Sequence, residues 1–336
     1  MKNIFSKIWY IVIAVVVVLV SFLFFLIEYF NKNDFVVSPL GTEVPSQVIV
    51  KPFDKYRVLD LANYVPKAAN YVIEKTLEDN LEFTSYLVSF YSDGKKVTGM
   101  VNVPKVEGPF QVIVMFRGYV DPEIYYTGLG SQKAGEVFAK NGYITFAPDF
   151  LGYAGSDKEA ENIFESRFQT YTTALDSLEI AKDIPNSIPG KVGIWAHSNG
   201  GQITLTVLEA TQKEYPTILW APVTKPFPYS ILYYTDEAED RGKFLRKELA
   251  KFEADYNVDE FAIADYVDRI KAPIQFHQGG ADESVPQKWS DEFVKSAKDS
   301  GVDIKYFTYP GSDHNLTPAW NTVVQRDLTF INSFLK

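Results

Sequence analysis

The chemistry of this sequence starts from Ser198, which lies in "WAHSNGG" between two apolar stretches. The pattern small-x-Ser-x-small is typical of a sharp strand-to-helix turn that exposes the serine hydroxyl, although an ordinary loop serine can also stand in it. A hydroxyl becomes an effective nucleophile only when a base takes its proton and an acid orients that base. The sequence must therefore supply both partners.

The search for the base is short because the chain has only three histidines. His197 adjoins the serine on the turn, so its side chain should point away from the hydroxyl. His277 lies within the apolar stretch "APIQFHQG", where a core histidine with satisfied hydrogen bonds is the commoner case. His314 follows the last apolar run, in "YPGSDHN", where a loop can bring an imidazole over the edge of a sheet. We therefore predict His314 as the base.

Asp282 is the candidate acid, because it stands in "GGADESVP" just beyond another apolar run. The order Ser198, Asp282, His314 is the order in which this serine turn and its partners occur in α/β hydrolases. The carboxyl ends of parallel strands meet at one edge of a sheet, which is where ligands bind. The three residues are thus expected to lie together.

The elements that must position these residues follow from the hydrophobic pattern. Two alternating stretches around Asp93-Gly94 predict an antiparallel hairpin over 83–105. The later apolar runs are separated by helical patterns, which predicts a parallel sheet covered by helices on both faces. These runs span 110–116, 143–149, 191–197, 217–222, 272–279 and 303–311, and the helical patterns include 131–142, 166–184 and 320–335.

One connection is too long for a simple loop. About 50 residues separate the runs that end and begin near Pro222 and Pro273, and structureless loops of that length are uncommon in compact domains. We predict a helical lid insertion over 223–268, lying over the carboxyl edge of the sheet. Its aromatic residues are compatible with an aromatic pocket and equally with packing of the lid helices; they are Phe227, Tyr229, Tyr233 and Tyr234.

Composition excludes several kinds of function. The net charge of −10, without clustered Lys and Arg, argues against a nucleic-acid partner. The absence of cysteine excludes disulfides, thiolate nucleophiles and cysteine-based metal sites. No metal site is predicted, since no His-x-x-x-His or carboxylate cluster has ligand spacing, and no cofactor is predicted, since no phosphate-binding glycine loop occurs.

The N-terminus departs from this globular composition. Residues 8–27 carry no charge, and about 20 helical residues cross a bilayer core of about 30 Å. The run is longer than the core of a usual signal peptide and lacks its cleavage pattern, so we favour an uncleaved transmembrane anchor over residues 1–30. Lys2 and Lys7 precede it, which predicts a cytoplasmic N-terminus and an extracytoplasmic remainder. Residues 31–80 are expected to form a stalk and N-terminal extension.

From about residue 83 onward the chain resembles α/β hydrolases of the prolyl oligopeptidase (serine peptidase) family. It is similar also to acetyl xylan esterases and dienelactone-hydrolase-like proteins. The resemblance rests on five motifs in order: "FRGY", "PDFLGYAGSD", "WAHSNGG", "GGADESVP" and "YPGSDHN". It implies a catalytic domain over residues 81–336 with a mostly parallel eight-stranded sheet.

The resemblance also implies roles for individual residues. Ser198 would be the nucleophile, Asp282 the acid and His314 the base. The backbone N–H groups of Asn199 and Tyr119 would form the oxyanion hole, where each donor typically lowers the barrier by about 3 kcal/mol.

Two positions leave alternatives open. Arg117 stands where relatives commonly have histidine, and it could pair with an acid such as Asp149 or contact substrate. Glu283 and Asp313 are acids close to the proposed one. We prefer Asp282 for its place in the Asp-x-x-Val-Pro turn.

These observations predict a membrane-anchored serine hydrolase that cleaves an acyl bond through an acyl-enzyme. The substrate would be a small molecule or a short peptide. A prolyl-oligopeptidase-like peptidase is the first reading, and a carboxylesterase acting on acetyl or short acyl groups is the alternative, because both use the same residues. An inactive hydrolase fold used as a binding module is the remote alternative, since such a module needs none of the three residues.

Overall fold

The structure is a computed structural model that describes residues 18–23, 51–235 and 238–336. The chain divides into two compact units, Met1–Lys51 and Pro52–Lys336, and the second contains the sheet. The predicted anchor over 1–30 lies outside the described residues except for 18–23, which are helical. Within the ranges described, no helix is both long enough and apolar enough to span a bilayer.

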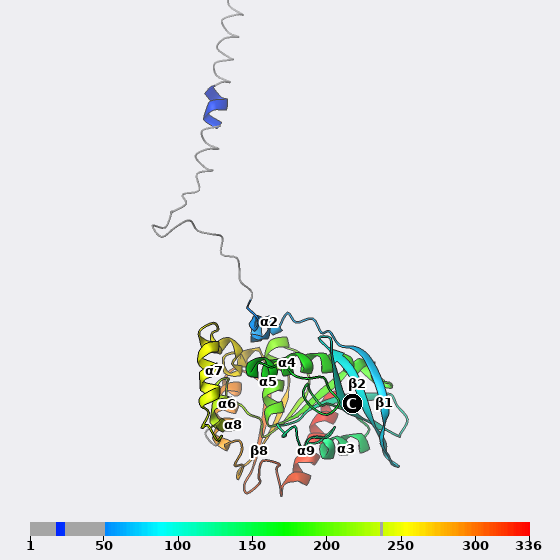
Figure 1. Ribbon diagram of the computed structural model, residues 1–336. Helices are drawn as coiled ribbons and strands as arrows, with labels where there is room; N and C mark the ends of the chain where they lie inside the picture. Colours follow the sequence, from blue (N-terminus) through cyan, green and yellow to red (C-terminus); the bar gives the residue numbers. More distant parts are fainter. Residues whose placement is uncertain (1–17, 24–50, 236–237) are drawn as a thin grey trace, which may run out of the picture. The chain divides into compact units, whose positions relative to one another are not determined.

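A nine-stranded sheet organises the described part of the larger unit, in the order β1-β2-β3-β5-β4-β6-β7-β8-β9 (Figure 1). The β1–β2, β2–β3 and β3–β5 pairs are antiparallel, and the remaining neighbours are parallel. The α/β hydrolase sheet with an antiparallel opening is therefore confirmed. The strands are β1 (Ala69–Asp79), β2 (Phe83–Ser92), β3 (Lys95–Pro104), β4 (Phe110–Phe116), β5 (Ile144–Pro148), β6 (Ser187–His197), β7 (Thr217–Trp220), β8 (Ile274–Gly279) and β9 (Ile304–Tyr309).

The predicted count of eight strands was wrong, because β1 lies in the segment expected to be an N-terminal extension. As an edge strand it pairs only with β2, and nearly all of its side chains are exposed on both faces. The alternation that reveals a half-buried strand is therefore missing from its sequence. The hairpin between β2 and β3 turns at Asp93-Gly94 as predicted, with both residues at positive φ.

Both faces of the sheet are buried at its central strands, as β4 illustrates. Val112, Val114 and Phe116 belong to one hydrophobic core, whereas Ile113 and Met115 belong to another on the opposite face. Successive side chains of a strand point to opposite faces, so each core needs its own covering helices. The first core contains residues of α4 (Ile163–Ile180), α5 (Asn199–Thr211) and α8 (Gln287–Asp299), and the second those of α3 (Gln132–Lys140) and α9 (Trp320–Leu335) (Figure 1).

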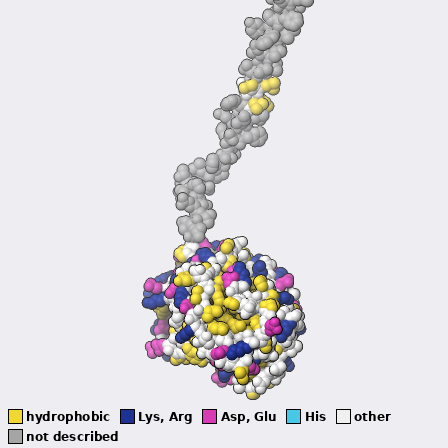
Figure 2. Space-filling model, turned by 90° about the vertical axis from the view of Figure 1, so that its right-hand side faces the viewer, with side chains coloured by type: hydrophobic (Ala, Val, Ile, Leu, Met, Phe, Trp, Pro, Cys, Tyr) yellow, Lys and Arg dark blue, Asp and Glu magenta, His cyan; other side chains and the backbone are white. Residues whose placement is uncertain are grey.

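The β1 edge of the sheet is partly apolar at the surface. Figure 2 views the molecule from this side, and hydrophobic side chains gather near the centre of the face. On β1 itself the large exposed apolar side chains are those of Val72, Ile73 and Leu77.

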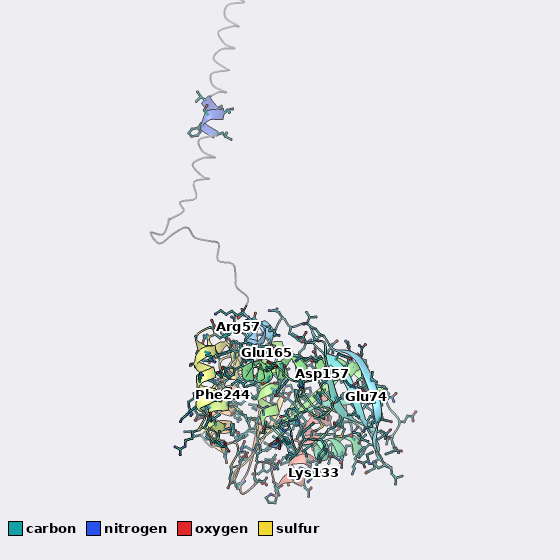
Figure 3. All side chains as sticks on the ribbon, in the orientation of Figure 1. Arg57, Glu74, Lys133, Asp157, Glu165 and Phe244 are labelled. Atoms are coloured by element: carbon teal, nitrogen blue, oxygen red, sulfur yellow. The ribbon has the colours of Figure 1, made fainter. Side chains whose placement is uncertain are left out.

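The insertion between β7 and β8 is helical, as predicted. Phe227 is buried against Phe168 and Phe252, so it serves core packing. Phe244 lies on the outer side of α7 and is exposed (Figure 3). The elements are α6 (Tyr229–Leu232), η3 (Tyr233–Thr235), α7 (Lys243–Glu253), η4 (Val258–Phe261), η5 (Ile263–Asp265) and η6 (Val267–Arg269).

A short segment before the sheet packs against this insertion. It contains η1 (Asp54–Tyr56) and α2 (Val58–Leu61). The ring of Phe53 stacks on that of Phe252 with centroids 5.7 Å apart. Arg57, labelled in Figure 3, places its Nε 2.9 Å from the carboxylate of Glu260. Residues 52–61 therefore help to fix the insertion over the sheet.

Candidate active site

Ser198 occupies the turn between β6 and α5, as the sequence pattern predicts. Its backbone has φ 55° and ψ −121°, a conformation that costs about 1–3 kcal/mol for a residue with a side chain. The Ser198 N–H donates to the carbonyl of Trp220 at 3.0 Å, and its own carbonyl accepts from the N–H of Val223 at 3.0 Å. The strained turn is thus held by the end of β7.

The two glycines that follow the serine are required by close packing. A Cβ on Gly200 would lie 2.0 Å from the carbonyl oxygen of Phe116. A Cβ on Gly201 would lie 2.2 Å from Cβ of Pro222. The start of α5 therefore approaches the ends of β4 and β7 more closely than any side chain permits.

The loop after β4 passes directly beside the serine. A Cβ on Gly118 would lie 2.9 Å from Cβ and 3.5 Å from Oγ of Ser198. Tyr119 follows in this loop, and Asn199 begins α5; both line the same cavity as Ser198. The Asn199 N–H is among the first four of α5, which have no acceptor within their own helix. These are the two residues predicted to supply an oxyanion hole.

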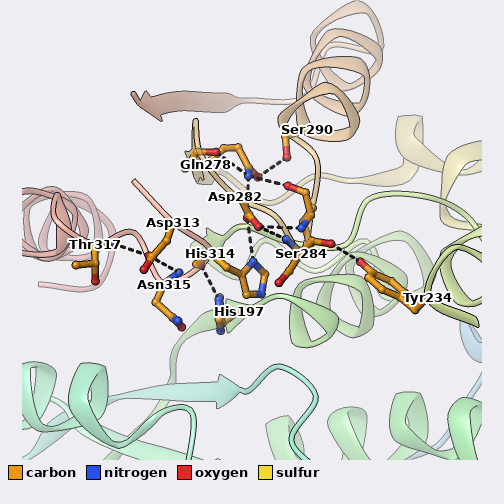
Figure 4. Close-up of polar contacts among 12 residues, drawn as sticks. His197, Tyr234, Gln278, Asp282, Ser284, Ser290, Asp313, His314, Asn315 and Thr317 are labelled. Atoms are coloured by element: carbon orange, nitrogen blue, oxygen red, sulfur yellow. Dashed lines mark hydrogen bonds and ion pairs between the residues drawn. The ribbon is translucent and has the colours of Figure 1, made fainter. Parts of the chain in front are cut away.

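Asp282 and His314 form a direct hydrogen bond beyond the ends of β8 and β9 (Figure 4). The distance from His314 Nδ1 to Asp282 Oδ2 is 2.9 Å. The Asp282 side chain is fully buried, whereas that of His314 is 20% exposed. The histidine therefore keeps one edge open to the cavity that Ser198 also lines.

Four donors converge on the Asp282 carboxylate. Oδ2 also accepts from Nε2 of Gln278 at 3.0 Å, and Oδ1 accepts from the N–H groups of Ser284 and Val285 at 2.9 and 2.8 Å. Burial by itself raises the pKa of Asp282, but the hydrogen bonds from His314 and Val285 outweigh it, so the net pKa is lowered. Asp282 is consequently an anion at neutral pH.

His197 contacts the loop that carries His314 and does not line the cavity that Ser198 lines. Its Nε2 lies 3.0 Å from the backbone carbonyl of His314 and must donate, since a carbonyl only accepts (Figure 4). The two imidazole rings lie 4.6 Å apart. Burial, and secondly the charge of His314, lower the pKa of His197 to about 4. His197 is therefore a neutral ring that anchors the His314 loop.

His277 lies in the core, as expected, although its Nε2 makes no hydrogen bond to any described residue. It is completely buried, with Nδ1 2.7 Å from the hydroxyl of Tyr309 and Nε2 2.9 Å from Oδ1 of Asp327. Both ring nitrogens face protein groups in the core, so this ring has no route to substrate.

Arg117 contacts Asp149, but through the backbone. Its Nη2 donates to the Asp149 carbonyl at 3.1 Å, and Nη1 donates to the Gly118 carbonyl at 2.8 Å. The guanidinium lies over the rings of Tyr125 and Tyr153, at 4.3 and 4.0 Å from their centroids. Arg117 thus shapes the loop that passes beside Ser198.

The insertion closes a cavity of about 520 Å³ over the serine. Three tyrosines of the insertion, Tyr229, Tyr233 and Tyr234, pack with Trp289. Of these three, Tyr234 alone lines the cavity, and it donates its hydroxyl to the carbonyl of Ser284 at 3.0 Å. The lining is made by Tyr119, Arg167, Ser198, Asn199, Val223, Ser230, Ile231, Tyr234, Thr235, Leu245, Ser284 and His314.

Three contacts near the site were not predicted from the sequence. Gln278 supports Asp282, and its own Oε1 accepts from Oγ of Ser290 at 2.6 Å. Arg167 lines the cavity from α4, and His197 holds the His314 loop. In the sequence, only "HQGG" at the end of β8, which contains Gln278, gave a signal for one of these three residues. The described residues contain no group of three or more His, Asp or Glu that could hold a metal ion.

The sheet, the strained serine turn and the helical cover define the α/β hydrolase class of serine hydrolases. Residues 131–336 match the prolyl oligopeptidase family, which is more than half of the chain. The protein belongs to that family, and it is a serine hydrolase of the peptidase or esterase type.

Two proteins similar in sequence are named as peptidases, and a solved structure with the same fold is named as an esterase. The chain is 23% identical over 251 residues to the uncharacterised peptidase YtmA of Bacillus subtilis, covering 73% of this chain and 91% of the relative. It is 24% identical to dipeptidyl peptidase family member 6 of Caenorhabditis elegans, covering 68% of this chain and only 31% of that longer protein. An acetyl xylan esterase from Paenibacillus sp. R4 shares the fold, with a TM-score of 0.61 and 17% identity over 83% of this chain and 92% of the esterase.

Proposed function

We propose that Ser198, His314 and Asp282 form the catalytic triad of this hydrolase. One observation carries the proposal: His314 is hydrogen-bonded to the buried Asp282 while it lines the same cavity as Ser198. In the proposed mechanism, Ser198 Oγ attacks the substrate carbonyl and His314 Nε2 accepts its proton. Asp282 keeps the proton of His314 on Nδ1 and stabilises the imidazolium that forms.

The remaining steps use the same groups. The backbone N–H groups of Asn199 and Tyr119 stabilise the negative oxygen of the tetrahedral intermediate. His314 then gives its proton to the leaving group as the acyl bond breaks, which leaves an ester on Ser198. Water, deprotonated by His314, cleaves that ester and restores the serine.

Peptide bonds are the first choice of substrate, because the chain belongs to a family named for a peptidase. Carboxylesters are the alternative, supported by a fold shared with an acetyl xylan esterase. The proposed triad serves both reactions equally. Selectivity would come from the insertion, which supplies Ser230, Ile231, Tyr234, Thr235 and Leu245 to the cavity.

We further propose that residues 1–30 anchor the enzyme in a membrane, with a cytoplasmic N-terminus and an extracytoplasmic catalytic domain. The charge-free run over 8–27 and the lysines before it support this arrangement. Substrates would then be small molecules or short peptides outside the cytoplasm.

The test is turnover of matched substrates, an aminoacyl p-nitroanilide and a short-chain p-nitrophenyl ester. Each is measured with the wild type and with Ser198→Ala and His314→Ala, which should lower kcat by several orders of magnitude without unfolding the protein. Cleavage of the amide supports the peptidase, and cleavage of the ester alone supports the esterase. Near-normal turnover in either variant would contradict the triad. Failure of a fluorophosphonate probe to label the wild type would favour the inactive binding module.

A further inference from the structure

Arg167 is a cation of the proposed active site that no sequence motif predicts. It lies on the second turn of α4, which packs beside α5, the helix that starts after Ser198 (Figure 1). Its side chain is half-buried and lines two cavities. One is the cavity of about 520 Å³ that contains Ser198 and His314, and the other has about 320 Å³. Both volumes are of the size that holds a small ligand or part of one.

Neutral groups hold this guanidinium from two other helices. Its Nη2 donates to Oε1 of Gln202 on α5 and lies 3.4 Å from Oγ of Ser230 on α6. Gln202 is itself fixed, because its Nε2 donates to Ser230 Oγ at 3.1 Å and to the carbonyl of Lys225 at 3.0 Å. Gln202 and Ser230 are almost completely buried. The arginine side chain is therefore positioned rather than free to swing.

Most hydrogen-bonding capacity of Arg167 remains unused. A guanidinium has five N–H donors, and the described residues supply acceptors only to Nη2. Nε is buried without a partner. No described Asp or Glu lies within ion-pair distance of Arg167, and none of the described residues that line the cavity of Ser198 is an acid. Glu159 lines only the smaller cavity.

We propose that Arg167 binds a carboxylate of the substrate, so that this enzyme selects acyl compounds with a free carboxylate close to the scissile bond. Half-buried cations normally have an anionic partner, and arginine pairs with carboxylates through two parallel hydrogen bonds. A substrate carboxylate would supply the missing acceptors while the scissile carbonyl lies beside Ser198. Among the described residues that line the cavity there is no acid to bind a substrate ammonium group, so charge recognition by these residues favours anions. This inference rests on the proposed function of Ser198.

The experiment compares esters that differ only in charge. On the acyl side, p-nitrophenyl hemiglutarate is measured against p-nitrophenyl pentanoate. On the leaving-group side, 4-butyryloxybenzoate is measured against its methyl ester. We expect the full-length wild type to prefer the anionic member of at least one pair by 10-fold or more in kcat/KM, as about one charge-assisted bidentate pair would give. Arg167→Met should bring the ratio of kcat/KM for the anionic over the neutral ester close to one, mainly through a higher KM for the anionic ester. Arg167→Lys should restore part of the preference for the anionic ester.

Lys225→Met is the matched control. Lys225 is a cation of the insertion that pairs with Glu292 at 2.6 Å and lines neither cavity. It should keep the wild-type ratio. The proposal is overturned if the wild type prefers neither anionic ester, or if Arg167→Met lowers both members of a pair by the same factor, as a structural role would. Ser198-dependent hydrolysis of the neutral esters, or labelling by a fluorophosphonate, establishes the proposed function whichever way the charge comparison falls.

Discussion

Replacing Asp282 by asparagine tests the proposed triad at its buried end. The carboxylate accepts from four donors, two on each oxygen: Ser284 and Val285 N–H on Oδ1, and Gln278 and His314 on Oδ2. The two backbone donors cannot rotate away, so an asparagine would keep its carbonyl oxygen toward them. Its NH₂ group would then face Nδ1 of His314.

That geometry reverses the tautomer of the base. To accept a hydrogen bond from the new NH₂, His314 must carry its proton on Nε2, and it can then no longer take a proton from Ser198. We expect kcat/KM to fall about 10⁴-fold, the loss typical of a wrong tautomer in such a triad. The Gln278 amide would also face the NH₂ group and would keep only the carbonyls of Gly279 and Val285 as acceptors, so the free energy of unfolding should fall by about 1 kcal/mol, the net value of one hydrogen bond.

The assay is steady-state hydrolysis of whichever chromogenic substrate the wild type cleaves, together with the rate of fluorophosphonate labelling and a denaturant unfolding curve. Glu283→Gln is the matched control, because it makes the same kind of change at the adjacent, exposed acid. It should retain wild-type kcat/KM. The reasoning is refuted if folded Asp282→Asn keeps more than a tenth of the wild-type activity, or if Glu283→Gln loses as much.

Two further predictions concern stability and the N-terminus. The pKa of His197 falls from its ordinary 6.5 to about 4 on folding, so the unfolded chain binds more protons between those values and the free energy of unfolding should decrease as pH falls from 6.5 to 4. His197→Gln keeps an N–H donor for the His314 carbonyl and should reduce this pH dependence of the free energy of unfolding, measured by denaturant titration. The same pH dependence in the variant and the wild type would contradict the lowered pKa of His197. A chain that starts at residue 31 should remain in the supernatant on ultracentrifugation and label with a fluorophosphonate, whereas aggregation without labelling would assign the apolar run to the folded core.

Most of the sheet could be predicted because a buried parallel strand leaves a contiguous apolar run in the sequence. The runs over 110–116 and 272–279 correspond to β4 and β8 within two residues. Strand β1 leaves no such run, since its side chains are exposed on both faces and its place depends on pairing with β2. The insertion could be predicted as a long connection, but which of its tyrosines lines the cavity could not, because that depends on how the helices pack.

The same distinction separates the parts of the site. Tyr119, Ser198, Asp282 and His314 each follow the end of a strand, and parallel strands bring their ends to one edge, so topology alone gathers them. Arg167 reaches this edge only because α4 packs against α5 and α6, and no local pattern records that packing. The residues proposed for the chemistry common to α/β hydrolases can therefore be found in the sequence at the ends of strands. The groups proposed to select a substrate belong to helices and the insertion, and only the folded structure brings them together.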